Sequence, residues 1–168
     1  MDDIEDGVRH VMGEGLVDSK RMCVVGWSYG GYAALMSSIR YPDRYRCTVS
    51  VAGVADPYSL VGTDGGLGRT FTKTLMPDTP ETIQASAPRR RASELKPPVL
   101  LLHGDLDINV DVSHSRDLKS ALEATGKAVA YTEYEGADHQ IGREAQRTDL
   151  LRRIGTFLDE HLAEASGE

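Results

Sequence analysis

Short apolar runs alternate along the chain with segments in which apolar residues recur every three or four positions. The runs at residues 22–25 and 99–102 are apolar throughout, as expected of strands buried on both faces of a parallel sheet, and residues 47–52 predict a further strand. Residues 127–134 alternate in character and predict a fourth strand. Helical spacing predicts helices over residues 2–12, 32–39, 111–124 and 150–162. Strands that alternate with helices predict an α/β fold whose parallel sheet is covered on both faces.

One long stretch interrupts this pattern. Residues 56–91 are rich in Gly, Thr and Pro, so an irregular excursion with short helices is expected there. No internal repeat, low-complexity tract or linker divides the chain. Residues 1–168 are therefore expected to belong to one domain.

The composition narrows the kind of protein. Forty per cent of the 168 residues are hydrophobic and 27% are charged, which is typical of a globular domain. The net charge of −7 repels phosphate backbones and anionic lipid, so neither nucleic acid nor a membrane surface is expected as a partner. No apolar run approaches the roughly 20 residues that a membrane span needs. The acidic N-terminus lacks the features of a signal peptide, and a cytoplasmic location is expected.

The chain has two cysteines, Cys23 and Cys47. Two cysteines are too few for a disulfide framework. Both lie in predicted buried strands, so we expect buried free thiols.

The sharpest motif is a G-x-S-x-G around Ser28, placed directly between a predicted strand and a predicted helix. That position is typical of a nucleophile elbow, in which glycines allow a sharp reversal and raise the serine hydroxyl above the end of the strand. The positive end of the following helix favours negative charge that develops there. The alternative is a tight turn in which Ser28 only caps the helix. Because the strand, elbow and helix all fall where the motif requires them, we favour a nucleophile.

A nucleophilic serine needs a general base, and His139 is the best candidate among five histidines. It lies in the turn after the fourth predicted strand, which opens on the same sheet edge as the elbow. His10 and His161 fall within the first and last predicted helices, where solvated or packed roles are expected. His114 lies in the predicted helix over residues 111–124, and His103 opens the loop after the third strand, where a structural role is expected.

The base needs a carboxylate to orient it. Asp105 and Asp107 both lie in the loop after the third strand, and position alone leaves both open. Asp138 is excluded because it adjoins His139 in the sequence and their side chains point apart. Calcium is also excluded, because the sixth and twelfth positions counted from Asp105 lack the glycine and glutamate of an EF-hand loop. No metal or cofactor is expected.

Residues 26–34, GWSYGGYAA, resemble the elbow of the prolyl oligopeptidase family of serine peptidases, which includes dipeptidyl peptidase IV-like and acylaminoacyl peptidase-like enzymes. Residues 97–110 are similar to the stretch that carries the acid of that family, and the match selects Asp107 over Asp105. The resemblance implies the C-terminal half of an α/β-hydrolase fold. It also implies a triad of Ser28, Asp107 and His139.

Further roles follow from the elbow and the resemblance. The backbone N–H of Tyr29, the residue after the nucleophile, is expected to supply one oxyanion donor. Tyr29, Asn109, Val110 and Tyr58 are the candidate substrate contacts, although Asn109 can equally be a loop-capping residue. The family often has proline after the valine that matches Val110, whereas this chain has Asp111.

The resemblance implies a serine hydrolase that cleaves short peptides through an acyl-enzyme. The alternatives are an esterase acting on small substrates and a truncated chain that is inactive alone. The elbow strand begins at residue 22, so the upstream strands, the loop that donates the second oxyanion N–H and the β-propeller of the family are expected to be absent. The elbow strand would then be an unprotected edge that pairs with a missing N-terminal segment or with a second copy of the chain.

Overall fold

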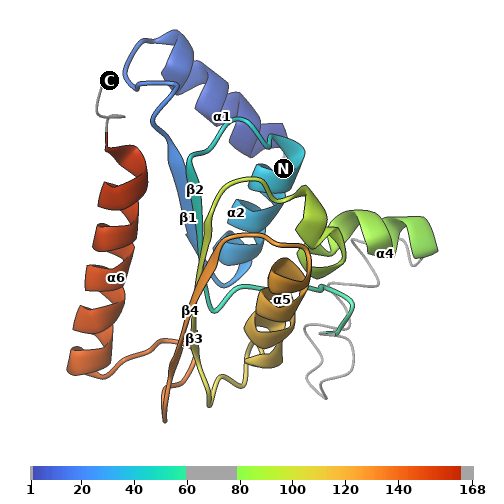
Figure 1. The fold of residues 1–168 in the computed structure, drawn as a ribbon, viewed down its shortest axis with the longest axis vertical. Helices are drawn as coiled ribbons and strands as arrows, with labels where there is room; N and C mark the ends of the chain where they lie inside the picture. The colour runs from blue at the N-terminus through green and yellow to red at the C-terminus, as the bar shows by residue number, and fades with distance from the viewer. Residues whose placement is uncertain (1, 60–78, 164–168) are drawn as a thin grey trace.

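The centre of the molecule is a sheet of four parallel strands (Figure 1). The computed structural model describes residues 2–59 and 79–163. The strands lie in the order β1-β2-β3-β4, so each is added beside the one before it. Their bounds are Cys23–Trp27 for β1, Cys47–Val51 for β2, Val99–Gly104 for β3 and Val129–Tyr134 for β4.

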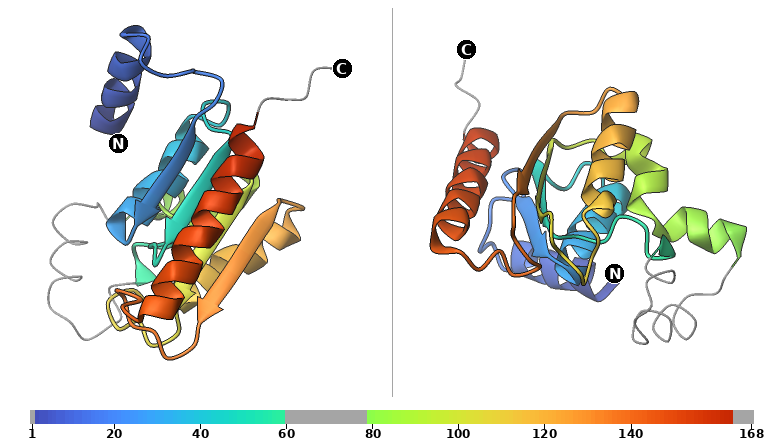
Figure 2. Two further views of the ribbon diagram at one scale, coloured as in Figure 1. Left: turned by 90° about the vertical axis from the view of Figure 1, so that its left-hand side faces the viewer. Right: turned by 90° about the horizontal axis from the view of Figure 1, so that it is seen from below.

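Helices cover both faces of this sheet. Figure 2 shows α6 alone in front of one face, while α2 and α5 lie on the other. The helix α1 packs beside the C-terminal end of α2, where Asp2 pairs with Arg40 at 2.8 Å and Glu5 with Arg44 at 2.8 Å. The helical bounds are Asp2–Gly13 for α1, Tyr29–Arg40 for α2, Pro80–Ser86 for α4, Pro88–Glu94 for the 3₁₀ segment η2, Ser113–Ala124 for α5 and Glu144–Leu162 for α6.

The two faces of the sheet bury two separate hydrophobic cores. In β3, Val99 and Leu101 belong to the cluster on the α2 and α5 side, whereas Leu100 and Leu102 belong to the cluster on the α6 side. Side chains alternate between the faces of a strand, so a strand covered on both faces is apolar at nearly all positions. This explains the continuous apolar run that identified β3 in the sequence.

The α/β fold and the parallel sheet expected from the sequence are confirmed. The predicted helices and strands are present with shifted ends: β1 extends to Trp27, and α2 begins at Tyr29, directly after the elbow. Helical residues 80–86 and 88–94 occupy the described end of the predicted excursion. Positions 60–78 of that excursion lie outside the described residues.

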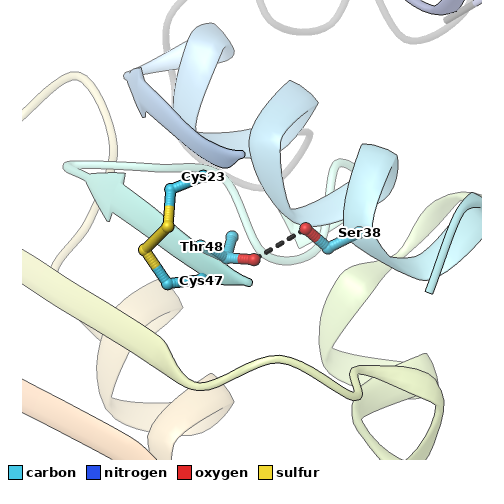
Figure 3. The surroundings of a disulfide bond; sticks show 4 residues. All are labelled: Cys23, Ser38, Cys47 and Thr48. Carbon is cyan, nitrogen blue, oxygen red and sulfur yellow. Dashed lines mark hydrogen bonds between the residues drawn. A yellow bond between two sulfur atoms is a disulfide. The ribbon is translucent and has the colours of Figure 1, made fainter. Parts of the chain in front are cut away.

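The expectation of free thiols is wrong. Cys23 and Cys47 form a disulfide between β1 and β2 (Figure 3), with Cα atoms 4.7 Å apart. The two residues are direct partners in the parallel pairing of β1 with β2, and that separation suits a disulfide. The error arose because a sequence shows that both cysteines lie in strands but not that the register of the pairing places them opposite each other.

One edge of the described sheet is β1, which pairs with β2. Val25, in the middle of β1, is 47% exposed. Neither proline nor a charged residue interrupts the strand. An apolar strand of this kind lacks the usual protection of a sheet edge, as the sequence predicted.

Candidate active site

The turn between β1 and α2 forces Ser28 into an unusual conformation. Ser28 has φ 57° and ψ −120°, outside the regions that residues other than glycine favour. Its backbone N–H donates to the carbonyl of Val51 at 2.8 Å, which fixes the turn to β2. A Cβ atom at Gly26 would collide with the carbonyl group of Gly30, so the turn can close this tightly only with glycine at position 26. This is the geometry of a nucleophile elbow.

The strands deliver the three expected triad residues to one edge of the sheet. Because β1 to β4 are all parallel, their carboxyl ends lie together, as the arrowheads in Figure 2 show. Ser28 follows β1, Asp107 follows β3 by three residues and His139 follows β4 by five. A single edge therefore collects residues that are far apart in the sequence.

Two of these residues are in direct contact. His139 Nδ1 lies 2.7 Å from Asp107 Oδ2, and both side chains are buried. Asp107 Oδ1 accepts the backbone N–H groups of Asn109 and Val110, each at 2.9 Å. Burial alone would raise the pKa of the Asp107 carboxyl, but hydrogen bonds from His103, Val110, His139 and Asn109 lower its pKa to about 2. The Asp107 carboxylate is therefore ionised at neutral pH, and both of its oxygens accept hydrogen bonds.

A second histidine contacts the same carboxylate oxygen. His103 Nε2 lies 3.2 Å from Asp107 Oδ2 and 2.9 Å from the carbonyl oxygen of Val110. Both neighbours are acceptors, so Nε2 carries the proton, and Nδ1 accepts from Ser115 Oγ at 2.7 Å. His103 is fully buried at the end of β3. Its structural role was predicted, but its contact with Asp107 was missed. The four-residue spacing between the two was the available signal.

The structure shows which of the acidic residues near His139 bonds to it. Asp105 Oδ1 accepts the backbone N–H of Gly136 at 2.6 Å and so holds the turn after β4. Asp138 Oδ1 accepts the backbone N–H of Gln140 at 3.0 Å. Asp107 is the carboxylate that bonds to His139, in agreement with the choice that the family resemblance made.

The four candidate substrate contacts lie in different settings. Tyr29 is 57% exposed, with its ring centroid 5.8 Å from that of Tyr32. Asn109 is exposed, and Tyr58 is half-buried in the loop after β2. Val110 belongs to the hydrophobic core on the α2 and α5 side. Its side chain thus faces the interior, and its backbone N–H holds Asp107.

The remaining histidines do not contact Asp107, and one of them, His114, lies near this edge beside the loop that follows β2. His10 is exposed on α1, and the ring of His161 packs edge-on against Phe157 in α6. His114 is buried in α5, where its Nδ1 accepts the backbone N–H groups of Ala55 and Asp56. Within residues 2–59 and 79–163 no cluster of three or more His, Cys, Asp or Glu side chains could hold a metal. No helix in that part of the chain is long and apolar enough to cross a membrane.

The parallel sheet, the flanking helices and the elbow define an α/β-hydrolase fold. A model of the Prolyl oligopeptidase family matches residues 1–165. The chain belongs to the prolyl oligopeptidase family.

Individual relatives agree with this assignment. The chain is 25% identical over 169 residues to dipeptidyl peptidase family member 6 of Caenorhabditis elegans, covering 95% of this chain and 23% of that protein. It is 28% identical over 151 residues to dipeptidyl aminopeptidase BIII of Pseudoxanthomonas mexicana, covering 84% and 22%. The chain thus spans less than a quarter of the length of these relatives.

Solved structures show the same fold. Dipeptidyl peptidase 4 of Porphyromonas gingivalis superposes with a TM-score of 0.76 at 29% identity, covering 87% of this chain and 20% of that one. The uncomplexed acylaminoacyl peptidase of Pyrococcus horikoshii superposes with a TM-score of 0.86 at 22% identity, covering 99% and 28%.

Proposed function

We propose that the chain carries the catalytic residues of a serine peptidase: Ser28 as nucleophile, His139 as general base and Asp107 as the acid that orients the base. The observation that carries this proposal is the 2.7 Å contact between His139 and Asp107 on the sheet edge where the elbow presents Ser28. Membership of the prolyl oligopeptidase family supports hydrolysis of a peptide bond.

The bonding of His139 assigns its two ring nitrogens different tasks. Asp107 accepts only, so the proton shared with it belongs to Nδ1 of the neutral ring. Nε2 then keeps its lone pair and can take the proton of Ser28 Oγ. The carboxylate stabilises the imidazolium that results, because it is already ionised and buried against the ring.

The reaction follows from these roles. Ser28 Oγ attacks the carbonyl carbon of the scissile bond while His139 Nε2 takes its proton. Tyr29 is the first residue of α2, so its backbone N–H has no partner within the helix and can donate to the oxyanion. The tetrahedral intermediate collapses as His139 protonates the leaving amine, which leaves an acyl-enzyme. Water then attacks the acyl carbon while His139 takes its proton. As the bond from that carbon to Ser28 Oγ breaks, His139 returns the proton to Oγ, which releases the acid and restores Ser28.

Short peptides are the proposed substrates. The relatives are named dipeptidyl peptidases and acylaminoacyl peptidases, which supports cleavage near the N-terminus of a peptide. Tyr29, Tyr58 and Asn109 are the residues with exposed or half-exposed side chains that we propose contact substrate. Val110 contributes through its backbone, which holds Asp107.

The free edge of β1 is proposed to pair with another strand, from an additional N-terminal segment or from a second copy of this chain. The exposed Val25 and the unprotected strand support this pairing. The 168 residues alone are then expected to associate and to hydrolyse amides poorly, because the second oxyanion donor of this fold comes from an upstream loop. A cytoplasmic location remains a prediction, and the disulfide weighs against it, since such bonds persist mainly in oxidising compartments.

A fluorophosphonate probe tests the site, because it reacts with activated serines and not with ordinary hydroxyls. We expect labelling of the wild-type chain and its loss in Ser28→Ala. Ser120→Ala is the matched control, since Ser120 is an exposed serine in α5 whose hydroxyl donates to the carbonyl of Arg116. An unlabelled wild-type chain would count against an assembled site. A peptide anilide and a short-chain ester assayed side by side on the full-length parent protein would separate peptidase from esterase activity.

A further inference from the structure

Three consecutive backbone carbonyls in the loop that carries His139 accept hydrogen bonds from side chains outside that loop. The carbonyl of His139 accepts the indole N–H of Trp27 at 3.1 Å. The carbonyl of Gln140 accepts Nη2 of Arg147, and the carbonyl of Ile141 accepts its Nε at 3.2 Å. The loop is thus held from two directions, by the last residue of β1 and by α6.

The two side chains that hold the loop also contact each other. The guanidinium carbon of Arg147 lies 5.0 Å from the centroid of the Trp27 ring, within the range of a cation–π interaction. The planar guanidinium can stack on the ring and still direct separate N–H groups to two carbonyls. A lysine ammonium at this position could keep the charge above the ring but not the fixed fork.

Trp27 connects this arrangement directly to the nucleophile. It immediately precedes Ser28, and its backbone is in register with Val51 in the sheet. Its indole reaches the backbone of His139 from a rigid strand end. The length and direction of that contact therefore constrain how far the His139 loop lies from the elbow.

The loop itself contains a conformation that needs support. Ile141 has φ 46°, a strained value for a β-branched residue, and its side chain is fully buried in the core on the α6 side. Such a backbone persists only where its surroundings fix it. Burial fixes the side chain of Ile141, and Arg147 bonds to its carbonyl.

We propose that Arg147 and Trp27 are positioning residues that fix the His139 loop against the Ser28 elbow. The proposal rests on the proposed function of Ser28 and His139 as nucleophile and base. Neither positioning residue touches the reacting atoms. They act on the separation of two groups whose alignment determines the rate of proton transfer.

The test compares the rate at which a fluorophosphonate labels Ser28 in wild type, Arg147→Met, Arg147→Lys and Trp27→Phe. Arg152→Met is the matched control, because Arg152 lies on the same helix with its side chain 68% exposed. We expect Arg147→Met to label about 100-fold more slowly, the effect of a displacement of about 1 Å at a reacting group. Arg147→Lys should lie between Arg147→Met and wild type, and Arg152→Met should match wild type.

Two further readouts do not depend on reactivity. Trp27 is the only tryptophan of the chain, so fluorescence reports on this contact alone. Arg147→Met should shift the emission of Trp27 and raise its quenching by acrylamide, whereas Arg152→Met should not. The NMR resonance of the His139 Nδ1 proton should broaden in Arg147→Met and in Trp27→Phe. The urea midpoints of these variants should stay close to that of Arg152→Met.

The outcomes separate this inference from the proposed function. An unlabelled wild-type chain would refute an active Ser28, but the Trp27 emission and the His139 proton would still decide whether Arg147 positions the loop. The inference is wrong if Arg147→Met leaves both the Trp27 emission and the His139 proton resonance unchanged and, where the wild type is labelled, is labelled at the same rate. Should Arg147→Met fail to fold, Arg147→Lys decides by the same readouts.

Discussion

Gly26 and Gly30 approach so closely across the elbow that a side chain on Gly26 would overlap the carbonyl group of Gly30. The close approach brings the end of β1 against the first turn of α2 and leaves Ser28 at the apex. The close approach of these glycines, together with the bond from the Ser28 N–H to the Val51 carbonyl, holds Ser28 in its strained backbone conformation.

Gly26→Ala should accordingly disrupt the elbow. We expect a loss of about 1 to 3 kcal/mol in the free energy of unfolding, as for other overpacked sites, together with loss of fluorophosphonate labelling. Urea denaturation measures the first effect. Gly155→Ala is the control, because Gly155 lies within α6 with open space around it, and alanine there should stabilise by about 0.5 to 1 kcal/mol. Equal stability of Gly26→Ala and wild type would show that the turn can relax.

The disulfide should contribute substantially to stability. It joins residues separated by 24 positions, and the loss of conformational entropy in the unfolded chain corresponds to about 3 kcal/mol for a loop of that size. We expect a reductant to lower the urea midpoint of the wild type by a corresponding amount. The double variant Cys23→Ala with Cys47→Ala should be insensitive to reductant. A wild type whose midpoint ignores the reductant would contradict the bond.

His114 should make stability depend on pH just below neutrality. Burial, and to a smaller extent the nearby His103, lowers the pKa of His114 from its ordinary 6.5. The unfolded chain then binds the proton more readily than the folded chain, so stability is lost as the pH falls below about 6.5. Structurally, Nδ1 accepts two backbone N–H groups and cannot be protonated without losing both.

His114→Asn separates titration from bonding, because an amide oxygen can accept the same N–H groups without titrating. We expect the variant to show a flatter profile of unfolding free energy between pH 7 and pH 5 than wild type. His10→Asn serves as the control, since His10 is exposed on α1, and it should leave the profile unchanged. Parallel profiles for His114→Asn and wild type would rule out His114 as the source.

Association through β1 is testable by light scattering. We expect the wild-type chain to be larger than a monomer, and Val25→Lys to raise the monomer fraction, because a charge on an edge strand discourages pairing. Leu151→Lys places the same charge on an exposed leucine of α6 and should not change the size. A wild-type chain that is monomeric at all concentrations would refute pairing between two copies of the chain.

Local patterns along the chain predicted most of the architecture and the chemical types of the site residues. The apolar run at residues 99–102 and the glycines around Ser28 are local features, so a single sequence contains them. Asp105 and Asp107 could not be separated by position, because both lie in one loop. The resemblance to the family selected Asp107, and the fold shows that this carboxylate bonds to His139.

What the sequence could not supply depends on contacts between distant segments. The pairing of Cys23 with Cys47 requires the register of two strands, which the pattern of apolar residues does not specify. The bonds from Arg147 to the His139 loop depend on where α6 crosses the sheet. The apolar stripe of that helix predicts which face is buried, but not which loop its arginine reaches.

The order of the strands has a consequence for synthesis. Because β1 to β4 lie side by side in the order in which they are translated, the ribosome releases the sheet from one edge to the other. Ser28 and Asp107 emerge first, and His139 is the last of the three to leave the exit tunnel. Arg147 follows eight residues later, so its bonds to the His139 loop can form only after all three have been translated. The nascent chain can therefore position His139 only after the residues of all four strands have been translated.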